Sequence, residues 1–313
     1  MSRYKQFEID QLKDYPLETR PSLVNFRAFA SALERDSFSA FIDSLPKILA
    51  ADQLRLLAQA IKNARDRHKP IIWAFGGHVI KVGLGPVLIQ LLEDGFVSAF
   101  ATNGAGMIHD FEIALAGHTS EDVEKDIQNG SFGMARETGE LLNRAIREGT
   151  ASEKGIGESV GSFLDGYPGV AHPELSVVLQ AHRRGVPLTV HIAIGTDTIH
   201  NHPMASGEAL GKGSLIDFRI LTQVVCDLGD GGVFLNLGSA VVIPEVFLKT
   251  VALVRNSGRE LERFTTANLD FIQHYRPTQN VVRRPVGKSG TGIALTGHHE
   301  IMVPLLAAML RFC

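Results

Sequence analysis

The sequence contains little cysteine, no long apolar run and no cluster of basic residues, and each absence narrows what the protein can be. Its two cysteines, Cys226 and Cys313, lie far apart, which argues against a disulfide scaffold or a cysteine zinc site and fits a reducing compartment. No apolar run reaches the roughly 18 residues of a membrane span, and the first residues are too polar for a secretion signal. The net charge is −3 and no stretch is rich in Lys or Arg, which makes nucleic acid a poor candidate partner. We therefore expect a cytoplasmic protein that binds neither membranes nor nucleic acid.

The 313 residues suffice for one large α/β domain with a helical appendage. Apolar residues recur at helical spacing between residues 21 and 67, which predicts two or three helices there. From residue 70 onward, short apolar runs alternate with helical stretches, and the predicted strands are 70–75, 96–101, 187–193, 232–237 and 292–296. This order is typical of a parallel sheet with helices on both faces. We therefore predict a helical N-terminal extension over residues 1–69 and a three-layer, Rossmann-like α/β domain over residues 70–313.

The most distinctive stretch is Thr102-Asn-Gly-Ala-Gly-Met-Ile-His-Asp110, which follows a predicted strand. Glycines at positions 104 and 106 let the backbone approach a ligand closely, and Asp110 is a candidate cap for a helix that begins there. The N-terminus of such a helix favours an anion such as a pyrophosphate. The stretch fits a nucleotide site or an active site, and it equally fits a plain strand-to-helix turn.

The other unusual motifs also follow predicted strands directly. They occupy residues 76–85, 194–203, 238–245 and 296–299. Because α/β proteins bind their ligands at the carboxyl ends of parallel strands, we expect a composite site at that edge of the sheet. The glycines between residues 155 and 169, in contrast, predict a loose connector.

Several of these blocks resemble the deoxyhypusine synthase-like NAD-binding proteins. Residues 102–110 match, without gaps, that family's Thr-Thr-Ala-Gly-Gly-Val-Glu-Glu-Asp turn. Thr196-Asp197 resembles its Thr-Asp-Gly segment, and Leu237–Val242 resembles its Leu-Gly-Gly-Gly-Val-Val turn. His298–Leu306 resembles the start of its closing helix, and Gly76–Leu92 resembles its first strand-to-helix turn.

The resemblance implies NAD as the cofactor. It also implies a homo-oligomer, a dimer or a tetramer, since the family binds NAD at the subunit interfaces of a homotetramer. Asp197 is expected to form a hydrogen bond with ribose or nicotinamide. The residues that the resemblance assigns to the cofactor are Gly77, Thr102, Asn103, Gly104, Ala105, Gly106, Asp197, Gly238, Ser239 and His298.

The substrate residues of that family are not retained. Its Glu-Glu pair falls on Ile108-His109, and its Trp-Gly-Lys becomes Val286-Gly287-Lys288. Losing carboxylates weakens the Coulomb attraction for a di- or trication such as spermidine. The His109-Asp110 pair is closer to a related ornithine- or saccharopine-processing domain. We therefore expect the substrate to be a small amine or amino acid, oxidised to an imine and then transferred or hydrolysed, rather than spermidine and a protein lysine.

The candidate catalytic residues are His109, Asp110 and Lys288. Imidazole titrates near neutrality, so His109 beside the cofactor turn can take the proton that leaves an amine; bonding to the turn is its alternative role. Lys288 lies in a glycine-containing loop with Arg283 and Arg284. There it can form a Schiff base, bind an anion or remain solvated.

Two further functions stay open at this point. His191, His200 and His202, with Asp197, have the side chains that hold a divalent metal, although their spacing is weak evidence for a metal-dependent lyase or hydrolase. A protein that binds a nucleotide without catalysing a reaction is the other alternative.

Overall fold

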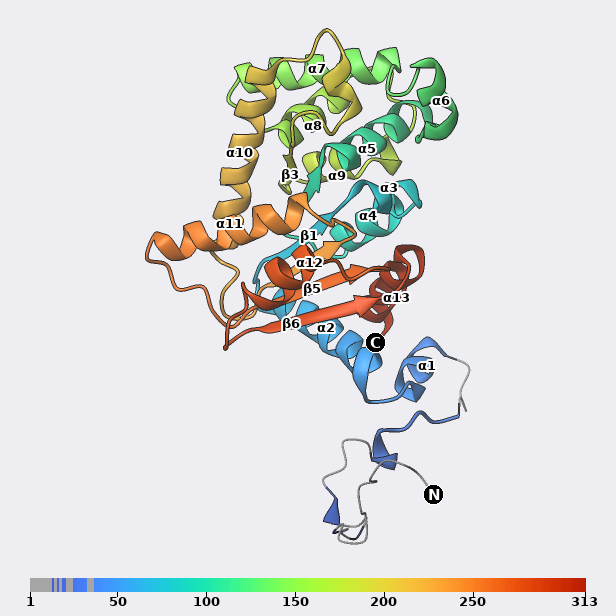
Figure 1. Ribbon diagram of the computed structural model, residues 1–313, viewed down its shortest axis with the longest axis vertical. Helices are drawn as coiled ribbons and strands as arrows, with labels where there is room; N and C mark the ends of the chain where they lie inside the picture. Colours follow the sequence, from blue (N-terminus) through green and yellow to red (C-terminus); the bar gives the residue numbers. More distant parts are fainter. Residues whose placement is uncertain (1–12, 14–15, 17–18, 21–24, 33–36) are drawn as a thin grey trace, which may run out of the picture.

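Six parallel strands form one sheet in the computed structural model, which describes residues 13, 16, 19–20, 25–32 and 37–313 (Figure 1). Their order across the sheet is β3-β2-β1-β4-β5-β6. The strands are β1 (Ile71–Phe75), β2 (Ala99–Asn103), β3 (Leu188–His191), β4 (Val233–Leu237), β5 (Thr265–Asp270) and β6 (Thr291–Thr296). The predicted fold class, a parallel α/β sheet of Rossmann type, is confirmed.

The strand order reverses beside β1, the first strand of the sheet. β1 pairs with β2 on one side and with β4 on the other, so the chain winds outward in both directions from this point. All five residues of β1 are buried because helices cover both of its faces. In an open α/β sheet, the gap between the carboxyl ends of two such strands is where a ligand binds. The ends of β1 and β4 therefore define the expected position of a ligand.

Helices cover both faces of the sheet. The helices are α1 (Phe38–Ser44), α2 (Leu49–Asp66), α3 (Gly77–Lys81), α4 (Gly85–Glu93), α5 (Gly104–Ala116), α6 (Val123–Asn129), α7 (Arg136–Ala151), α8 (Ile156–Gly166), α9 (Val177–Arg183), α10 (Gly207–Val225), α11 (Val242–Asn256), α12 (Tyr275–Pro277), a π-helix (Thr278–Arg283) and α13 (His299–Phe312). Short 3-10 helices occupy Phe26–Ala28, Pro173–Leu175 and Thr198–Asn201. Within the described part of the chain, none of these helices has the length and apolar character needed to cross a bilayer.

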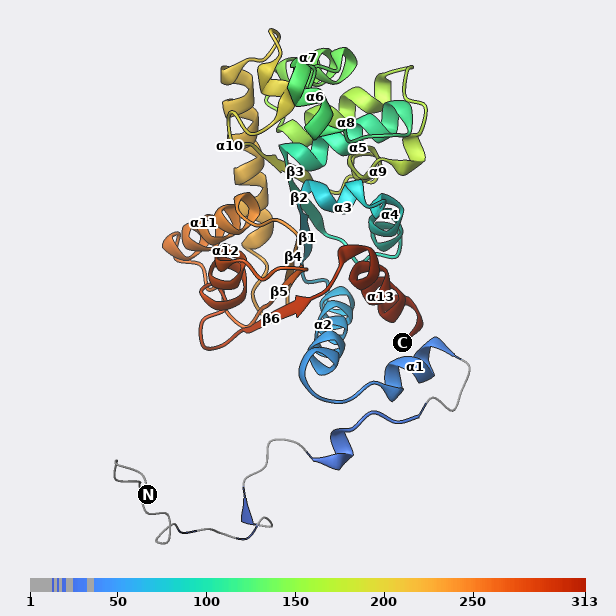
Figure 2. The same cartoon turned by 45° about the vertical axis from the view of Figure 1, so that its right-hand side comes forward.

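The two faces of the sheet have separate apolar cores. One core joins α2, α4, α5, α9 and α13 to alternate residues of β1, including Trp73. The other core joins α10 and α11 to strand residues that point to the opposite face, including Ile72 of β1 and Phe234 of β4. Figure 2 shows α2 and α13 on one side of the sheet and α10 and α11 on the other. The alternation of strand residues between the two cores gives the three layers.

Helices α1 and α2 account for the part of the helical pattern predicted between residues 21 and 67 that begins at Phe38. α2 packs against β1, β4, β5 and β6, and against α13. The parts of the expected N-terminal extension at 1–12, 14–15, 17–18, 21–24 and 33–36 lie outside the described residues. Helix α2 is thus part of the layer that covers the sheet. The division of the chain into two parts at residue 69 stays a prediction.

The prediction of a loose connector between residues 155 and 169 is wrong, because Ile156–Gly166 forms helix α8. Its glycines permit close packing. A Cβ on Gly157 would lie 1.7 Å from the carbonyl oxygen of Leu188, and a Cβ on Gly161 would lie 2.7 Å from the side chain of His182. These glycines let α8 lie directly against β3 and α9.

Strand β5 was not predicted from the sequence. Its residues, Thr265-Thr-Ala-Asn-Leu-Asp270, alternate polar with apolar side chains and so lack a continuous apolar run. The structure buries the polar side chains nonetheless, since Thr266 donates to the carbonyl oxygen of Val281 and Asn268 bonds to neighbouring amides. Tertiary hydrogen bonds make this polar segment an interior strand.

Candidate active site

The residues expected to hold a cofactor lie along the carboxyl edge of the sheet. Gly77 follows β1, Gly238 follows β4 and His298 follows β6. A Cβ on Gly76 would lie 2.8 Å from the carbonyl oxygen of Gly238, so the turns after β1 and β4 touch through their backbones. The Ser239 hydroxyl accepts from the Ile243 amide in the first turn of α11. This edge combines bare backbone with helix N-termini.

Helix α5 begins at Gly104, six residues earlier than predicted. Asn103, and not Asp110, is its N-cap, and its side chain accepts a hydrogen bond from the Gly106 amide at 3.0 Å. The Thr102 hydroxyl donates to the carbonyl oxygen of Phe75 and ties β2 to β1. A Cβ on Gly106 would lie 2.1 Å from that hydroxyl. The glycine turn is thus the first turn of the helix, packed tightly against the end of the sheet.

Asp110 lies in the second turn of α5 and is 2 % exposed. Its carboxylate accepts hydrogen bonds from the Ser176 hydroxyl and from the amides of Val177 and Val178, at 2.5, 2.7 and 3.2 Å. Burial raises the pKa of Asp110 to about 6, against the opposing effect of these donors. Asp110 therefore caps α9, a neighbouring helix, and its carboxylate is committed to that contact.

A cavity of about 230 Å³ opens beside the first turns of α5. His109, Glu112 and Ala105 of this helix line it together with Lys81 at the end of α3 and Asp197 from the loop after β3. A Cβ on Gly77 would lie 3.2 Å from Cδ2 of His109, which places the imidazole against the start of α3. The cavity thus joins residues that follow β1, β2 and β3.

His109 contacts a hydroxyl and, through it, a carboxylate. Its Nδ1 lies 2.7 Å from Oγ1 of Thr119, and that hydroxyl donates to Oε2 of Glu112 at 2.5 Å. The Thr138 hydroxyl donates to the other oxygen of Glu112 at 2.9 Å. Burial lowers the pKa of His109; nearby Glu112 opposes this effect, and Lys81 adds to it. His109 is therefore neutral at pH 7 and able to accept a proton.

Asp197 and His200 meet next to the same cavity. The Asp197 carboxylate accepts from the His200 amide, and Nδ1 of His200 accepts from the amides of Gly195 and Asp197 at 3.1 and 3.3 Å. Asp197 Oδ2 and His200 Nε2 lie 3.8 Å apart, and both are buried without a hydrogen-bond partner. Burial raises the pKa of Asp197 to about 6. Both atoms are buried polar groups without a hydrogen bond, and such groups are rare in folded proteins.

A second cavity, of about 440 Å³, lies on the other side of Glu112. Its lining includes the carboxylates of Glu121 and Glu137 and the ring of Tyr167. Glu112, Ser120 and Glu121 line both cavities. Glu112 thus stands at the boundary between the space beside His109 and a larger acidic space.

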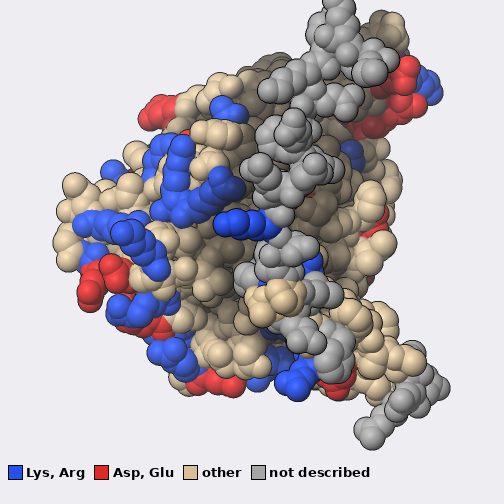
Figure 3. Space-filling model, turned by 60° about the horizontal axis from the view of Figure 1, so that its bottom comes forward, with Lys and Arg blue, Asp and Glu red and all other residues tan. Residues whose placement is uncertain are grey.

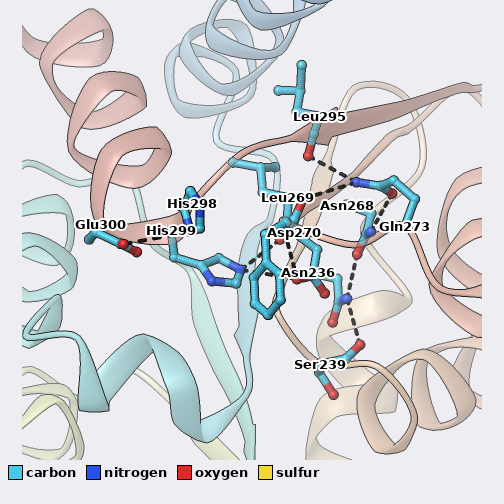
Figure 4. A network of polar contacts seen from close by, with 11 residues as sticks. Asn236, Ser239, Asn268, Leu269, Asp270, Gln273, Leu295, His298, His299 and Glu300 are labelled. Atoms are coloured by element: carbon cyan, nitrogen blue, oxygen red, sulfur yellow. Dashed lines mark hydrogen bonds and ion pairs between the residues drawn. The ribbon is translucent and has the colours of Figure 1, made fainter.

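The strands on the other half of the sheet end in a chain of amide hydrogen bonds (Figure 4). Nδ2 of Asn236 donates to Asn268, Asn268 donates to Gln273, and Gln273 donates to the carbonyl oxygen of Leu295. The first of these amides also donates to the carbonyl oxygen of Ser239. The chain joins β4, β5 and β6 and fixes the loop after β5.

Imidazole rings at the start of α13 connect this loop to helix α3, which follows β1. His299 is buried and its Nε2 lies 3.0 Å from the carbonyl oxygen of Leu269, while its Nδ1 has no hydrogen-bond partner. Its ring centroid lies 5.5 Å from that of His78, and the exposed ring of His298 stacks on Phe271 at 6.0 Å. Burial lowers the pKa of His299, so its ring is neutral at pH 7. A row of aromatic rings therefore continues from α3 to the start of α13.

Lys288 does not join these residues. It precedes β6 and therefore lies at the amino edge of the sheet, whereas His109 follows β2 at the carboxyl edge. Other cations lie at that edge, since Arg263, Lys69 and Arg67 together lower the pKa of Asp230. Lys and Arg side chains gather on the left of the molecular face in Figure 3. Lys288 is thus separated from the cavity by the length of the strands.

The three histidines considered as metal ligands, His191, His200 and His202, each contact a different partner. His191 is buried on β3, where its Nε2 contacts the Thr189 hydroxyl at 3.0 Å and burial lowers its pKa to about 3. Nδ1 of His202 accepts from the Met204 amide. Among the residues that the structure describes, no group of three or more His, Cys, Asp or Glu side chains is placed to hold a metal ion.

Sequence reasoning missed Lys81, Glu112 and Thr119. Glu112 is three residues from His109, a spacing that places both on one face of a helix, and this signal could have revealed it. Thr119 comes from the loop after the helix. Its contact with His109 depends on how the chain returns there, and no local pattern encodes that return.

The fold defines an α/β protein with a Rossmann-type strand order, and the candidate site lies at the carboxyl edge of its sheet, after β1, β2 and β3. No protein-family model matches the chain. The chain is 22% identical over 229 residues to a deoxyhypusine synthase-like protein of Chlorobaculum parvum, an alignment that covers 65% of this chain and 64% of the relative. It thus spans less than two thirds of the length of the curated relative that it matches.

Solved structures share the fold. A conserved LOR/SDH protein of Methanococcus maripaludis has a TM-score of 0.52 at 15% identity, with 90% of this chain and 72% of that one covered. AgrE, solved with ornithine and NAD+, has a TM-score of 0.52 at 14% identity, with 84% of this chain and 34% of that one covered. The predicted resemblance to the deoxyhypusine synthase-like proteins is confirmed by the curated relative, from which this chain is divergent at 22% identity.

Proposed function

We propose that this protein is an NAD-dependent enzyme that oxidises the amine of a small amino acid or amine to an imine, which is then hydrolysed or transferred. The observation that carries the proposal is the cavity beside α5, which is lined by a neutral imidazole, His109, and by Asp197, whose Oδ2 is buried without a hydrogen-bond partner. AgrE, which shares the fold, was solved with an amino acid and NAD+.

The residues present fit a dinucleotide. Gly77 and Ala105 lie in the first turns of α3 and α5, whose N-termini would favour a pyrophosphate, and Gly104 lets Asp197 approach the same turn. Gly238 and Ser239 would border the cofactor after β4, and His298 would border it after β6. Thr102, Asn103 and Gly106 would act indirectly, by fixing the turn before α5. Asp197 Oδ2, which has no partner, would accept a hydrogen bond from a ribose or nicotinamide group.

Bound NAD supplies the hydride acceptor. His109 takes the proton that leaves the substrate amine, because its neutral ring lines the cavity and can hold an added proton. Glu112 and Glu121 line the same cavity and attract an ammonium group, while Lys81 attracts a carboxylate. Asp110 and Lys288 have no part in this chemistry, since Asp110 caps α9 and Lys288 lies at the opposite edge.

Calorimetric titration with NAD tests the cofactor, and a panel of amines and amino acids tests turnover through reduction of NAD. We expect saturable micromolar binding in the wild type. His109→Ala should remove turnover and leave NAD affinity within about tenfold. Unchanged turnover in that variant would contradict the role of His109. NAD binding without turnover across the panel would favour a non-catalytic nucleotide-binding protein instead.

The oligomeric state and the cellular compartment also stay proposals. A homo-oligomer, a dimer or a tetramer, is implied by the resemblance, and light scattering of the purified protein during gel filtration tests it. A monomeric mass would contradict it. The cytoplasmic location stays a prediction from the two unpaired cysteines.

A further inference from the structure

The contacts around His109 determine which of its nitrogens carries the proton. The Thr119 hydroxyl has one hydrogen, and it is donated to Oε2 of Glu112, since an ionised carboxylate can only accept. Toward Nδ1 of His109, at 2.7 Å, the hydroxyl must therefore act as acceptor. Nδ1 carries the hydrogen in the neutral ring, and Nε2 carries the lone pair.

The orientation of this chain of contacts is fixed at its far end. Glu112 accepts from Thr119 on one oxygen and from Thr138 on the other, so its carboxylate cannot rotate without losing a hydrogen bond. Thr138 belongs to α7 and is 9 % exposed. A buried side chain of a separate helix thus holds the carboxylate that directs the Thr119 hydroxyl.

His109 lines the cavity in which a substrate would lie, and its second nitrogen is not engaged by the described part of the protein. Among the described residues, Nε2 of His109 makes no hydrogen bond, whereas Nδ1 is bonded. The ring lines the cavity beside α5, and its Cδ2 edge, next to Nε2, lies against Gly77. The contacts with Thr119 thus leave the acceptor nitrogen available.

We propose that Thr119 and Glu112 are positioning residues that hold His109 in the Nδ1–H form, so that Nε2 is the atom that takes the substrate proton. This inference rests on the proposed function for the source of that proton. The N–H bond of the substrate breaks, an Nε2–H bond forms, and Nδ1 keeps its hydrogen and its contact with Thr119. Glu112, whose Oε2 lies 4.0 Å from Nδ1, stabilises the resulting imidazolium and is not itself protonated.

The charges that face His109 come from several elements. Glu112 of α5 favours the protonated ring, and Lys81 of α3 opposes it. Asp197 and Glu121 line the same cavity from the loops after β3 and α5. Replacing Glu112 removes the stabilising charge closest to Nδ1, so the pKa of His109 must fall in that variant.

NMR of histidine labelled with ¹⁵N reads this arrangement in the full-length protein without any ligand. Loss of one set of ring signals in His109→Gln assigns the residue. At pH 7 we expect the wild-type ring to be protonated on Nδ1 and not on Nε2. Thr119→Val should convert a measurable fraction to the Nε2–H form, because its methyl group cannot accept the hydrogen bond. Thr119→Ser keeps the hydroxyl and should keep the wild-type form.

Titration of the same ring signals tests the electrostatic effect of Glu112 on His109. The pKa of His109 should be lower in Glu112→Gln than in the wild type. A wild-type ring protonated on Nε2, or a Thr119→Val spectrum identical to the wild type, would overturn the inference. These readouts need neither NAD nor substrate, so they stand if NAD fails to bind and the proposed function falls. If turnover is found, Thr119→Val should lower kcat at least about tenfold with little change in KM. Thr119→Ser, which keeps the hydroxyl, should keep the wild-type kcat.

Discussion

Gly104 and Asp197 lie so close together that a Cβ on residue 104 would meet Oδ2 of Asp197 at 2.1 Å. The contact brings a carboxylate from the loop after β3 onto the first turn of α5. It occurs at the helix N-terminus, where the backbone favours negative charge. The contact explains why this turn needs glycine even though it lies within a helix.

Gly104→Ala should therefore destabilise the protein by about 1–3 kcal/mol, because the added methyl group displaces Asp197. Urea denaturation measures this cost. The matched control is the same change in an Asp197→Ala background, where the obstructing carboxylate is gone and the cost should largely disappear. An equal cost in both backgrounds would show that the close contact with Asp197 is not its cause.

The buried carboxyl of Asp217 makes stability depend on pH. It accepts hydrogen bonds from the amides of Gly157 and Val190, yet burial raises its pKa to about 7 from an ordinary value of 3.8. Between these two values the folded state binds more protons than the unfolded state, so this group's contribution falls as pH rises from about 4 to about 7. Asp217→Asn keeps an acceptor for the two amides and removes the titration.

Urea denaturation at pH 5 and pH 8 tests that linkage. Relative to the wild type, Asp217→Asn should gain stability between pH 5 and pH 8, since only the wild type loses the contribution of a protonated Asp217. Glu153→Gln, at an exposed position, is the control and should follow the wild type. A constant difference between Asp217→Asn and the wild type would mean that Asp217 titrates normally in the fold.

The sequence predicted the strands that contain a run of apolar residues, and it missed β5, whose polar residues are buried through hydrogen bonds with other segments. β1 is recognisable from Ile71-Ile-Trp-Ala-Phe75, because an uninterrupted apolar run is typical of a strand covered on both faces. β5 carries Asn268 in its interior, and only the amides of Asn236 and Gln273 make that position tolerable. Those partners come from other strands and loops, which no local pattern identifies.

The candidate site was predicted in the same uneven way. His109 and Asp197 were placed at the correct edge, since both follow predicted strands. Glu112, Thr119 and Thr138 assemble around His109 from separate segments, and their contacts are tertiary. Lys288 precedes a predicted strand, so its place at the amino edge could have been inferred from the sequence.

Asn268→Ala tests the amide chain at the end of β5. The change leaves Nδ2 of Asn236 with one acceptor fewer and Oε1 of Gln273 without its donor, at a cost of about 2–3 kcal/mol. Hydrogen exchange should also become faster in the loop 271–274, which the chain fixes. Asn201→Ala, at an exposed position, is the control. Unchanged exchange in the loop of Asn268→Ala would mean that other contacts hold it.

Lys288→Ala distinguishes the two edges of the sheet. β6 has six residues, which at about 3.3 Å each separate Lys288 from the carboxyl edge by roughly 20 Å. The variant should bind NAD as the wild type does and keep its stability within about 0.5 kcal/mol. His109→Ala is the matched variant at the cavity, where turnover should be lost. If Lys288→Ala were to lose NAD binding or turnover while remaining folded, its side chain would have to reach a site in a second copy of the chain, and the site would then lie between subunits.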